Sequence, residues 1–493
     1  MAASQPPRSP YRDLIRMVAV SGEQIRSTIF SNFQSSHNGS SYSSDSGSSN
    51  SYPSNNSGGS SGSASAALPD PDLGFHELTI IALQMVNDGY TERMVQAYNA
   101  ASPPTAAFEY GGGQDRAALD NWFSELDVDW VLQLREGYGL QHVVQFPDWL
   151  LQDLVEKWIR ALTVIVVSIM KLSFVGHGTP EVARFGKASI AEMLVFTDAI
   201  VPALKAGNLQ DVLDMYICVS NASSYMSLPF EIGSLFMPSE IGSPLARAGT
   251  RLNNAISSTM EKVRRLIEDD DLWAIEIPRG GGAVHRNTRF MVDCIVSIRK
   301  TRASTENSAP SDHTRNLYGL MSVAIKYQMD LLVIKSMLCS DPSLRYLFLL
   351  NNFNFIANVL EQWRSDHDPW LERLRLKREC EKHMDRYIDV SWGHVISCIP
   401  KSVFSLPLIH RWSNTSLLAD FESAFHKTYQ AQMFWKVPEP RLRNLLRESI
   451  AKRVISVYRD CLEENPELQK HVNAGTSSSP YVLEEMLREL FEG

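Results

Sequence analysis

The chain has 493 residues, a length that exceeds what one hydrophobic core usually supports, so we expect several packed units. Hydrophobic residues make up 44% of the sequence and ten tryptophans are present, which is enough apolar material for large cores. The formal net charge of −9 argues against a general nucleic-acid-binding protein, which usually carries a basic patch or stripe. The cysteines form no C-x-x-C pair, which excludes a compact zinc ribbon or thioredoxin-type motif and suits reduced thiols in the cytosol.

The first 34 residues are expected to hold one short amphipathic helix, from about residue 11 to residue 33. Its apolar side chains recur at helical spacing and are Leu14, Val18, Ile25 and Ile29. No uninterrupted apolar stretch of signal-peptide length occurs here, and residue 2 is alanine, whereas myristoylation requires glycine. We therefore expect a cytoplasmic protein without a signal peptide.

Residues 35–67 are rich in Ser, Gly and Asn, a composition typical of a disordered linker that cannot bury a core. The linker contains a G-x-S-x-G match, GGSSG, at residues 58–62. A hydrolase would place this motif between a strand and a helix, and neither is indicated here. We interpret the match as chance.

From residue 68 onward, apolar residues recur every three or four positions, and the alternation typical of strands is scarce. We therefore predict an all-α protein, with N-terminal and middle helical bundles over residues 68–300 and C-terminal bundles over residues 301–493. The most apolar run, Ala161–Met170, would be about 15 Å long as a helix, about half of a bilayer core. It is predicted to be a buried helical segment and not a membrane span.

The stretch GGGAVHRNTRF, residues 280–290, contains glycines, a histidine and two arginines that could in principle bind a phosphate. A phosphate-binding loop needs G-x-x-x-x-G-K-[ST] after a strand, which is absent here, and the acidic run at residues 268–271 would repel an anion. The alternative is a joint in which Pro278 ends one element, the glycines turn the chain and a helix begins between His285 and Thr288. His285 would then be a structural or capping residue with a neutral imidazole.

Catalytic and metal-binding patterns are also missing from the sequence. No H-E-x-x-H motif, His/Cys cluster or Ser-His-Asp arrangement is indicated. The acidic runs EDDD at residues 268–271 and DHDP at residues 366–369 could hold calcium, but such runs are usually solvated loops. We expect no enzyme activity, no metal and no cofactor.

Two basic stripes are the candidate binding residues. The first lies on one face of a helix through residues 370–387 and consists of Arg375, Arg378, Lys382 and Arg386. The second lies on a helix through residues 441–460 and consists of Arg441, Lys452 and Arg459. Glu379 and Glu448 dilute the two stripes. Each stripe is either a solvated face or an anionic-lipid surface, where every unpaired cation contributes about 1 kcal/mol.

Several segments together resemble one family. Gly281–Ile295 (GGAVHRNTRFMVDCI) is similar to the G-G-A-V-H-x-x-T-R segment of the seventy-kilodalton subunit of the plant exocyst, a vesicle-tethering complex. Other similar segments follow in the family's order: MVNDGYTERMVQAY, EKWIRAL, LQDVLDMY, LRYLFLLNNFNFI, WGHVISCI, residues 421–462 and the terminal LFEG. The resemblance covers about residues 75–493.

This resemblance implies an elongated rod of stacked, mostly antiparallel helical bundles without an active site, in which GGGAVHRNTRF is an inter-helix joint. It also implies a non-enzymatic subunit that helps tether secretory vesicles to the plasma membrane in exocytosis, and some members of the family it resembles act in plant defence. The implied partners are other exocyst subunits, small GTPases and phosphoinositide-containing membranes, and no nucleic acid. The expected location is cytoplasmic and peripheral, at the plasma membrane or vesicles.

Two departures from the family pattern motivate an alternative. A short helix and a Ser/Gly/Asn-rich linker stand where the family usually has a long coiled-coil-forming region. Near the C-terminus, NAGTSSSPYVLEEML replaces lysine-bearing text that belongs to the family's phosphoinositide surface. The alternative is a diverged helical adaptor outside the exocyst, a protein-interaction scaffold in immunity or autophagy-related traffic.

Overall fold

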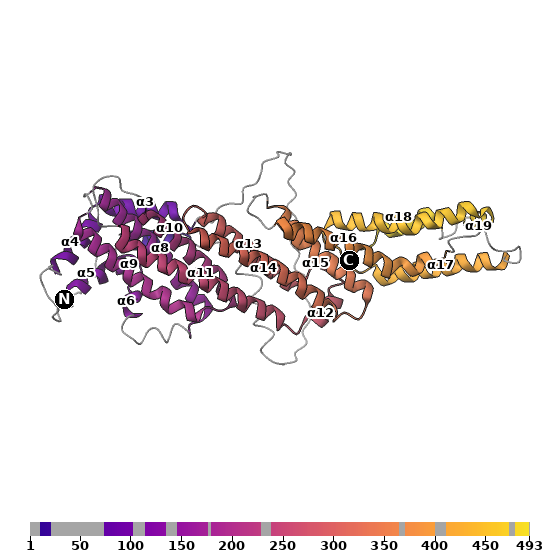
Figure 1. The fold of residues 1–493 in the computed structure, drawn as a ribbon, viewed down its shortest axis with the longest axis horizontal. Helices are drawn as coiled ribbons and strands as arrows, with labels where there is room; N and C mark the ends of the chain where they lie inside the picture. Colours follow the sequence, from indigo (N-terminus) through magenta and orange to yellow (C-terminus); the bar gives the residue numbers. More distant parts are fainter. Residues whose placement is uncertain are drawn as a thin grey trace, which may run out of the picture. The chain divides into compact units, whose positions relative to one another are not determined.

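Every regular element that the structure describes is a helix, which confirms the all-α prediction (Figure 1). The computed structural model describes residues 10–20, 73–101, 114–134, 145–175, 179–227, 238–363, 370–399, 411–472 and 479–492. Contacts group them into two compact units, unit 1 from residues 1–263 and 297–317 and unit 2 from residues 264–296 and 318–493. The boundary predicted between residues 300 and 301 lies inside the helix Arg286–Thr305.

Unit 1 is a helical bundle built around the long helix α8 (Asp148–Val175), which packs against α3, α9 and α10. Its other described helices are α1 (Pro10–Met17), α3 (Phe75–Asn87), α4 (Tyr90–Ala101), α5 (Gln114–Glu125), α6 (Trp130–Leu134), α9 (Pro180–Ile200), η1 (Val201–Ala203), η2 (Ala206–Asn208), α10 (Leu209–Ser227) and most of α11 (Pro238–Glu268). In α8 the apolar run Ala161–Met170 is buried apart from the half-buried Val167, as predicted. The indole Nε1 of Trp158 donates to the Met193 carbonyl at 2.7 Å and so ties α8 to α9.

The N-terminal helix α1 is shorter than predicted. It ends at Met17, and residues 18–20 continue without helical structure. Val20 is fully buried, and the Val18 carbonyl accepts a hydrogen bond of 2.7 Å from Nε of Arg160 in α8. The prediction of one continuous helix was therefore wrong at this point, because contacts with the rest of unit 1 hold the chain in a non-helical path.

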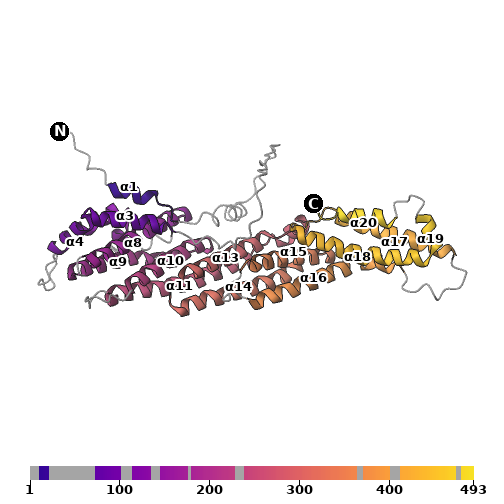
Figure 2. The same ribbon diagram turned by 90° about the horizontal axis from the view of Figure 1, so that it is seen from above.

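The face of α1 that packs inward also differs from the prediction. Tyr11 and Ile15 are buried, whereas Leu14 is 43% exposed. Figure 2 shows α1 beside α3, with which it is in contact. The other two residues of the predicted apolar face, Ile25 and Ile29, lie outside the described residues. The described part of this segment thus packs on its own bundle.

Unit 2 is a second set of packed helices, with close contacts between α15 and α16, between α16 and α18 and between α18 and α20 (Figure 2). Its described helices are α12 (Trp273–Arg279), part of α13 (Arg286–Thr305), most of α14 (Ser311–Ser336), α15 (Pro342–Glu361), α16 (Trp370–Ser397), α17 (Arg411–Gln432), α18 (Pro440–Glu464), α19 (Pro466–Val472) and α20 (Pro480–Arg488). The core of this unit includes Tyr387, Trp392, Phe425, Tyr458 and Phe491.

Three helices of unit 2 begin at an acceptor followed by proline, a pattern that fixes where each helix starts. Oδ1 of Asp341 accepts from the backbone amide of Ser343 at 2.8 Å at the start of α15. Glu439 plays the same part for α18 and Ser479 for α20. The side chain satisfies amides that the first turn leaves unpaired, and proline at the first position has no amide to satisfy.

Among the described stretches, α14 is the one helix that is long and apolar enough to cross a membrane. Of its most apolar window, 44% is buried in the fold. Core helices of many proteins share this length and composition, so the feature is weak evidence for a membrane span.

Candidate functional site

The glycine stretch of residues 280–282 is a joint between two helices, as the sequence predicted. α12 ends at Arg279 and α13 begins at Arg286. Gly281 and Gly282 have φ angles of 57° and 80°, a region that residues with a Cβ rarely adopt. Glycine here therefore serves the sharp turn of the backbone.

The same turn forms hydrogen bonds with two other parts of unit 2. The Lys436 amide, in the connection between α17 and α18, donates to the Gly281 carbonyl at 2.8 Å. The amide Nδ2 of Asn351, in α15, donates to the Gly282 carbonyl at 2.7 Å and to the Lys436 carbonyl at 2.8 Å. One side-chain amide thus joins both turns to α15.

His285 is a capping residue in this joint, which agrees with the prediction. Its ring stacks on Trp273 with centroids 3.8 Å apart, and Nδ1 accepts from the Asn287 amide at 3.2 Å at the start of α13. Burial lowers the pKa of His285 to about 4, although the charge of Asp270 opposes that change. The imidazole is therefore neutral at pH 7.

Arg286, the first arginine of the stretch at residues 280–290, is held by acids of the same unit. Nη2 of Arg286 lies 2.8 Å from Oδ2 of Asp270, and its Nε lies 3.1 Å from Oε2 of Glu276. Asp270 also accepts from Nδ2 of Asn287 at 2.7 Å. Because its guanidinium already meets two carboxylates, Arg286 is a structural partner of α12 and does not form a phosphate cradle.

The two acidic runs considered for calcium differ in what the structure describes. In the run at residues 268–271, Glu268 accepts from Tyr327 at 3.0 Å and Asp270 is used in the joint. The run at residues 366–369 lies outside the described residues. Within the described ranges, no group of three or more His, Cys, Asp or Glu side chains is arranged to hold a metal ion.

The first basic stripe lies on a single helix, α16, and all four of its side chains are exposed: Arg375, Arg378, Lys382 and Arg386. The helical spacing therefore places them on one face, as predicted. Three of them have partners within unit 2. Nη2 of Arg375 lies 3.8 Å from Oδ1 of Asp330, and Nζ of Lys382 donates to Oε2 of Glu379 at 2.8 Å. The Arg386 guanidinium lies 5.9 Å from the centre of the Tyr346 ring.

Glu379 weakens this stripe in the way that the sequence indicated. Burial alone would raise the pKa of Glu379, but the hydrogen bond from Lys382 and the charges of His383 and Arg375 together lower it. The carboxylate is therefore ionised at neutral pH and offsets part of the positive charge. Among the described residues, Arg378 is the cation of this stripe that has neither an ion pair, a hydrogen bond nor a ring contact.

The second stripe lies on α18, and the structure adds cations that the spacing did not reveal. Lys452 and Arg459 line a hollow of about 360 Å³ between α18 and α20. Arg447 and Arg488 line the same hollow, whereas Arg441, nearer the start of α18, is exposed outside it. Sequence reasoning missed Arg447 because it lies off the stripe on α18, and Arg488 because it comes from α20.

Carboxylates also line this hollow and reduce its positive charge. Nη2 of Arg459 lies 2.6 Å from Oε2 of Glu484, and Arg488 lies 3.5 Å from the other oxygen of the same carboxylate. Glu448 is exposed on the rim. Lys452, by contrast, has no ion pair or hydrogen bond within the described part of the chain. The hollow can attract an anion mainly through Lys452, with Arg459 available after its ion pair opens.

Comparison with known proteins identifies the family. The model for the C-terminal region of Exo70, a component of the exocyst complex, matches residues 180–489. The chain is 24% identical over 464 residues to the exocyst complex component EXO70B2 of Arabidopsis thaliana, covering 84% of this chain and 68% of that protein. It is 24% identical over 461 residues to EXO70A1 of the same plant, covering 84% and 66%, and 23% identical over 421 residues to EXO70E2, covering 77% and 61%. The chain thus spans about two thirds of the length of these relatives.

A solved structure of the S. cerevisiae exocyst component Exo70p aligns with 84% of this chain and 94% of that one, at 11% identity and a TM-score of 0.42. The family model accounts for more than half of the sequence and reaches into both units. From that match we conclude that the chain belongs to the Exo70 family of exocyst complex subunits.

Proposed function

We propose that the protein is a non-enzymatic subunit of the exocyst that helps to tether secretory vesicles to the plasma membrane. The observation that carries this proposal is the family match over residues 180–489. An all-helical protein whose candidate residues are surface cations suits a role in holding partners together. Other exocyst subunits are its expected partners, and a peripheral position at the plasma membrane or vesicles is its expected location.

Purification of the tagged full-length chain from its native tissue tests the complex. We expect the other exocyst subunits to be recovered in repeated experiments, at levels well above those obtained with a tagged unrelated helical protein. Repeated recovery of the intact chain without any exocyst subunit would contradict the proposal. Small GTPases and a role in plant defence belong to the same proposal. Co-purification of small GTPases or of defence proteins with the chain would support them.

The membrane part of the proposal concerns the cations of α16 and α18. Vesicles that contain phosphoinositide should bind the chain in co-sedimentation, and binding should weaken with added salt because exposed charges are screened. Reversal of Arg378 and Lys452, which have no ion pairs among the described residues, should weaken binding most. The matched control is Arg247→Glu, which changes a cation of unit 1 that is also exposed and has no ion pair among the described residues. Equal binding by all variants would remove these stripes from the proposal.

A second candidate function is a helical adaptor outside the exocyst, a scaffold for protein partners in immunity or autophagy-related traffic. The observation that favours it is the pairing of Arg375, Lys382 and Arg459 with carboxylates of the same chain. Paired cations contribute less to binding an anionic membrane because their field is already partly cancelled. Failure to bind vesicles together with failure to recover exocyst subunits would favour this candidate.

A further inference from the structure

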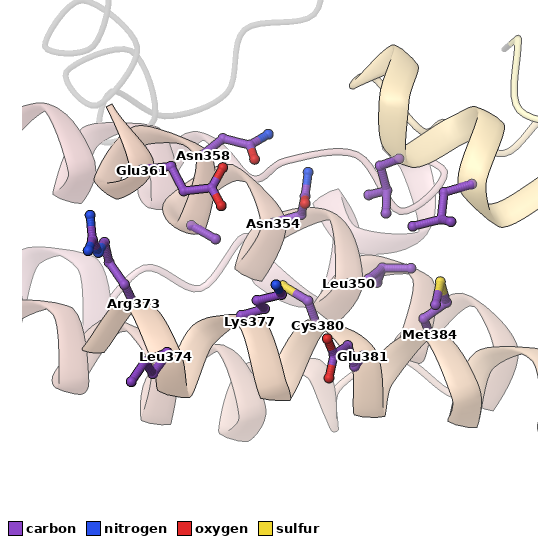
Figure 3. Close-up of a pocket in the computed structure, with 13 residues that line it drawn as sticks. Leu350, Asn354, Asn358, Glu361, Arg373, Leu374, Lys377, Cys380, Glu381 and Met384 are labelled. Carbon is purple, nitrogen blue, oxygen red and sulfur yellow. The ribbon is translucent and has the colours of Figure 1, made fainter. Parts of the chain in front are cut away.

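A groove of about 580 Å³ lies between α15 and α16 and is closed at one end by the first turns of α18 (Figure 3). The α15 wall carries Leu350, Asn354, Asn358 and Glu361, which recur at helical spacing along one face. Facing residues of α16 extend from residue 373 to residue 384. At the rise of a helix, each wall is about 16 Å long, or about three helical turns.

The groove is mainly apolar at one end, although Glu381 lies near Met384 there, and it is more charged at the other end. Leu350 and Met384 lie at the apolar end. Leu442 and Leu445 of α18 also line the groove. Glu361 and Arg373 lie at the opposite end, as Figure 3 shows. Leu445 is 48% exposed, which leaves apolar surface at this end open to solvent. A ligand that fits must therefore be apolar along part of its length and polar along the rest.

The walls of the groove also restrict the backbone of the ligand. Both walls are helices, so their amides and carbonyls are already bonded within each helix. They offer no free edge on which an extended peptide could add a strand. A ligand helix satisfies its own backbone groups and presents an apolar stripe at the spacing of a groove between helices.

Two charges at the polar half of the groove lack ion-pair partners among the residues that the structure describes. They are Lys377 on α16 and Glu361 on α15. Arg373 also lines the groove and donates to the Trp363 carbonyl at 2.9 Å. A further acid of the lining, Glu381, lies one turn beyond Lys377 on α16 and has no ion pair among the described residues. A ligand carboxylate could form an ion pair with Lys377, and a ligand cation could form one with Glu361. A Glu–Lys pair one turn apart on a helix supplies both charges.

We propose that this groove binds an amphipathic helix of a partner protein, about three turns long, with a leucine-type stripe at one end and an acid–base pair at the other. Its apolar side chains occupy the space beside Leu445 and Met384, and its charges face Lys377 and Glu361. The residues of α16 that line the groove project from a different face of the helix than the basic stripe of Arg375, Arg378, Lys382 and Arg386. Helix binding and membrane binding therefore use separate surfaces. The inference therefore does not depend on the proposed membrane role.

The test uses two labelled synthetic helices and the full chain, with fluorescence anisotropy as the measurement. Each helix has about four turns, a leucine stripe at one end and a Glu–Lys pair at the other, and the two differ only by exchange of Glu and Lys. We expect saturable binding and a preference for one of the two. In the double variant Lys377→Glu with Glu361→Lys, the preference should invert, whichever way the helix runs in the groove.

A second variant tests the apolar end. Leu445→Glu should weaken binding about tenfold, because it places a carboxylate of the groove against the leucine stripe of the ligand. Val390→Glu is the matched control, since Val390 is also apolar, 43% exposed and on α16 but not in the groove. Circular dichroism should show unchanged helix content in both, because neither side chain is buried.

Four outcomes would count against the proposal. One is the absence of saturable binding by either helix, and another is a preference that stays the same in the double variant. The third is self-association of the chain, seen by sedimentation velocity and abolished by Leu445→Glu, which would identify a second copy as the occupant. Equal effects of Leu445→Glu and Val390→Glu would likewise count against the groove.

Discussion

On each of three helices, cations are spaced so that they share one face of that helix. Those of α1 are Arg12 and Arg16, and the others form the stripes of α16 and α18. Their surroundings differ. Both arginines of α1 converge on Oδ1 of Asp127, at 2.6 Å each, and the Asp127 side chain is only 5% exposed. The stripe cations lie on exposed faces, and those with ion pairs meet carboxylates that are themselves partly exposed. The comparison shows that spacing groups cations on a face, while the burial of the facing acid decides whether they hold the fold together or remain available to a ligand.

The largest expected effect comes from removing the buried acid. Asp127→Asn should destabilise the docking of α1 by about 2 kcal/mol, a value below that of a fully buried pair because both arginines are partly exposed. Asparagine tolerates the φ of 63° at this position, so the change isolates the loss of charge. Exchange of the amide hydrogens of residues 11–17 should become faster. The control is Asp129→Asn, since Asp129 is 50% exposed and lies 3.9 Å from Arg12.

An effect of similar size is expected from a buried group that is kept neutral. The pKa of His285 is lowered to about 4 from an ordinary value of 6.5, so between these values the unfolded chain binds a proton that the folded chain does not. Stability from this group is complete above pH 6.5 and is lost as the pH falls towards 4. Between pH 7 and pH 5 the loss should be about 2 kcal/mol.

Urea unfolding at the two pH values measures that loss. His285→Asn keeps an acceptor for the Asn287 amide but removes the titrating ring, so the pH dependence of unfolding should become shallower by the same amount. His383, whose pKa burial also lowers to about 4, remains in the variant and leaves part of the dependence in place. An unchanged pH profile would contradict the assignment to His285.

The smallest expected effect is a difference in vesicle binding between variants of two cations that line the same hollow. Lys452→Gln should weaken vesicle binding by about 1 kcal/mol, whereas Arg459→Gln should weaken it less, because Arg459 is already paired with Glu484. Co-sedimentation at low salt measures the difference between them. If Arg459→Gln has the larger effect, the ion pair with Glu484 opens on the membrane and the comparison between paired and unpaired cations must be revised.

The sequence predicted features that depend on local spacing and missed those that depend on distant contacts. The glycine joint and the capping role of His285 follow from neighbouring residues, and both are confirmed. The end of α1 could not be predicted, because it depends on Arg160, which is far along the chain. In the same way, the faces of the stripes followed from helical geometry, while the acids opposite them, Asp330 and Glu484, come from other helices.

The double hydrogen bond from Asn351 has a mechanical consequence. Its single amide group bridges carbonyls of Gly282 and Lys436, which belong to connections more than a hundred and fifty residues apart in sequence. The two connections are therefore joined twice, directly by the hydrogen bond from the Lys436 amide to the Gly281 carbonyl and indirectly through Asn351 of α15. Because these hydrogen bonds join three segments that are distant in sequence, we expect the segments to separate in a single step when this part of the fold is strained.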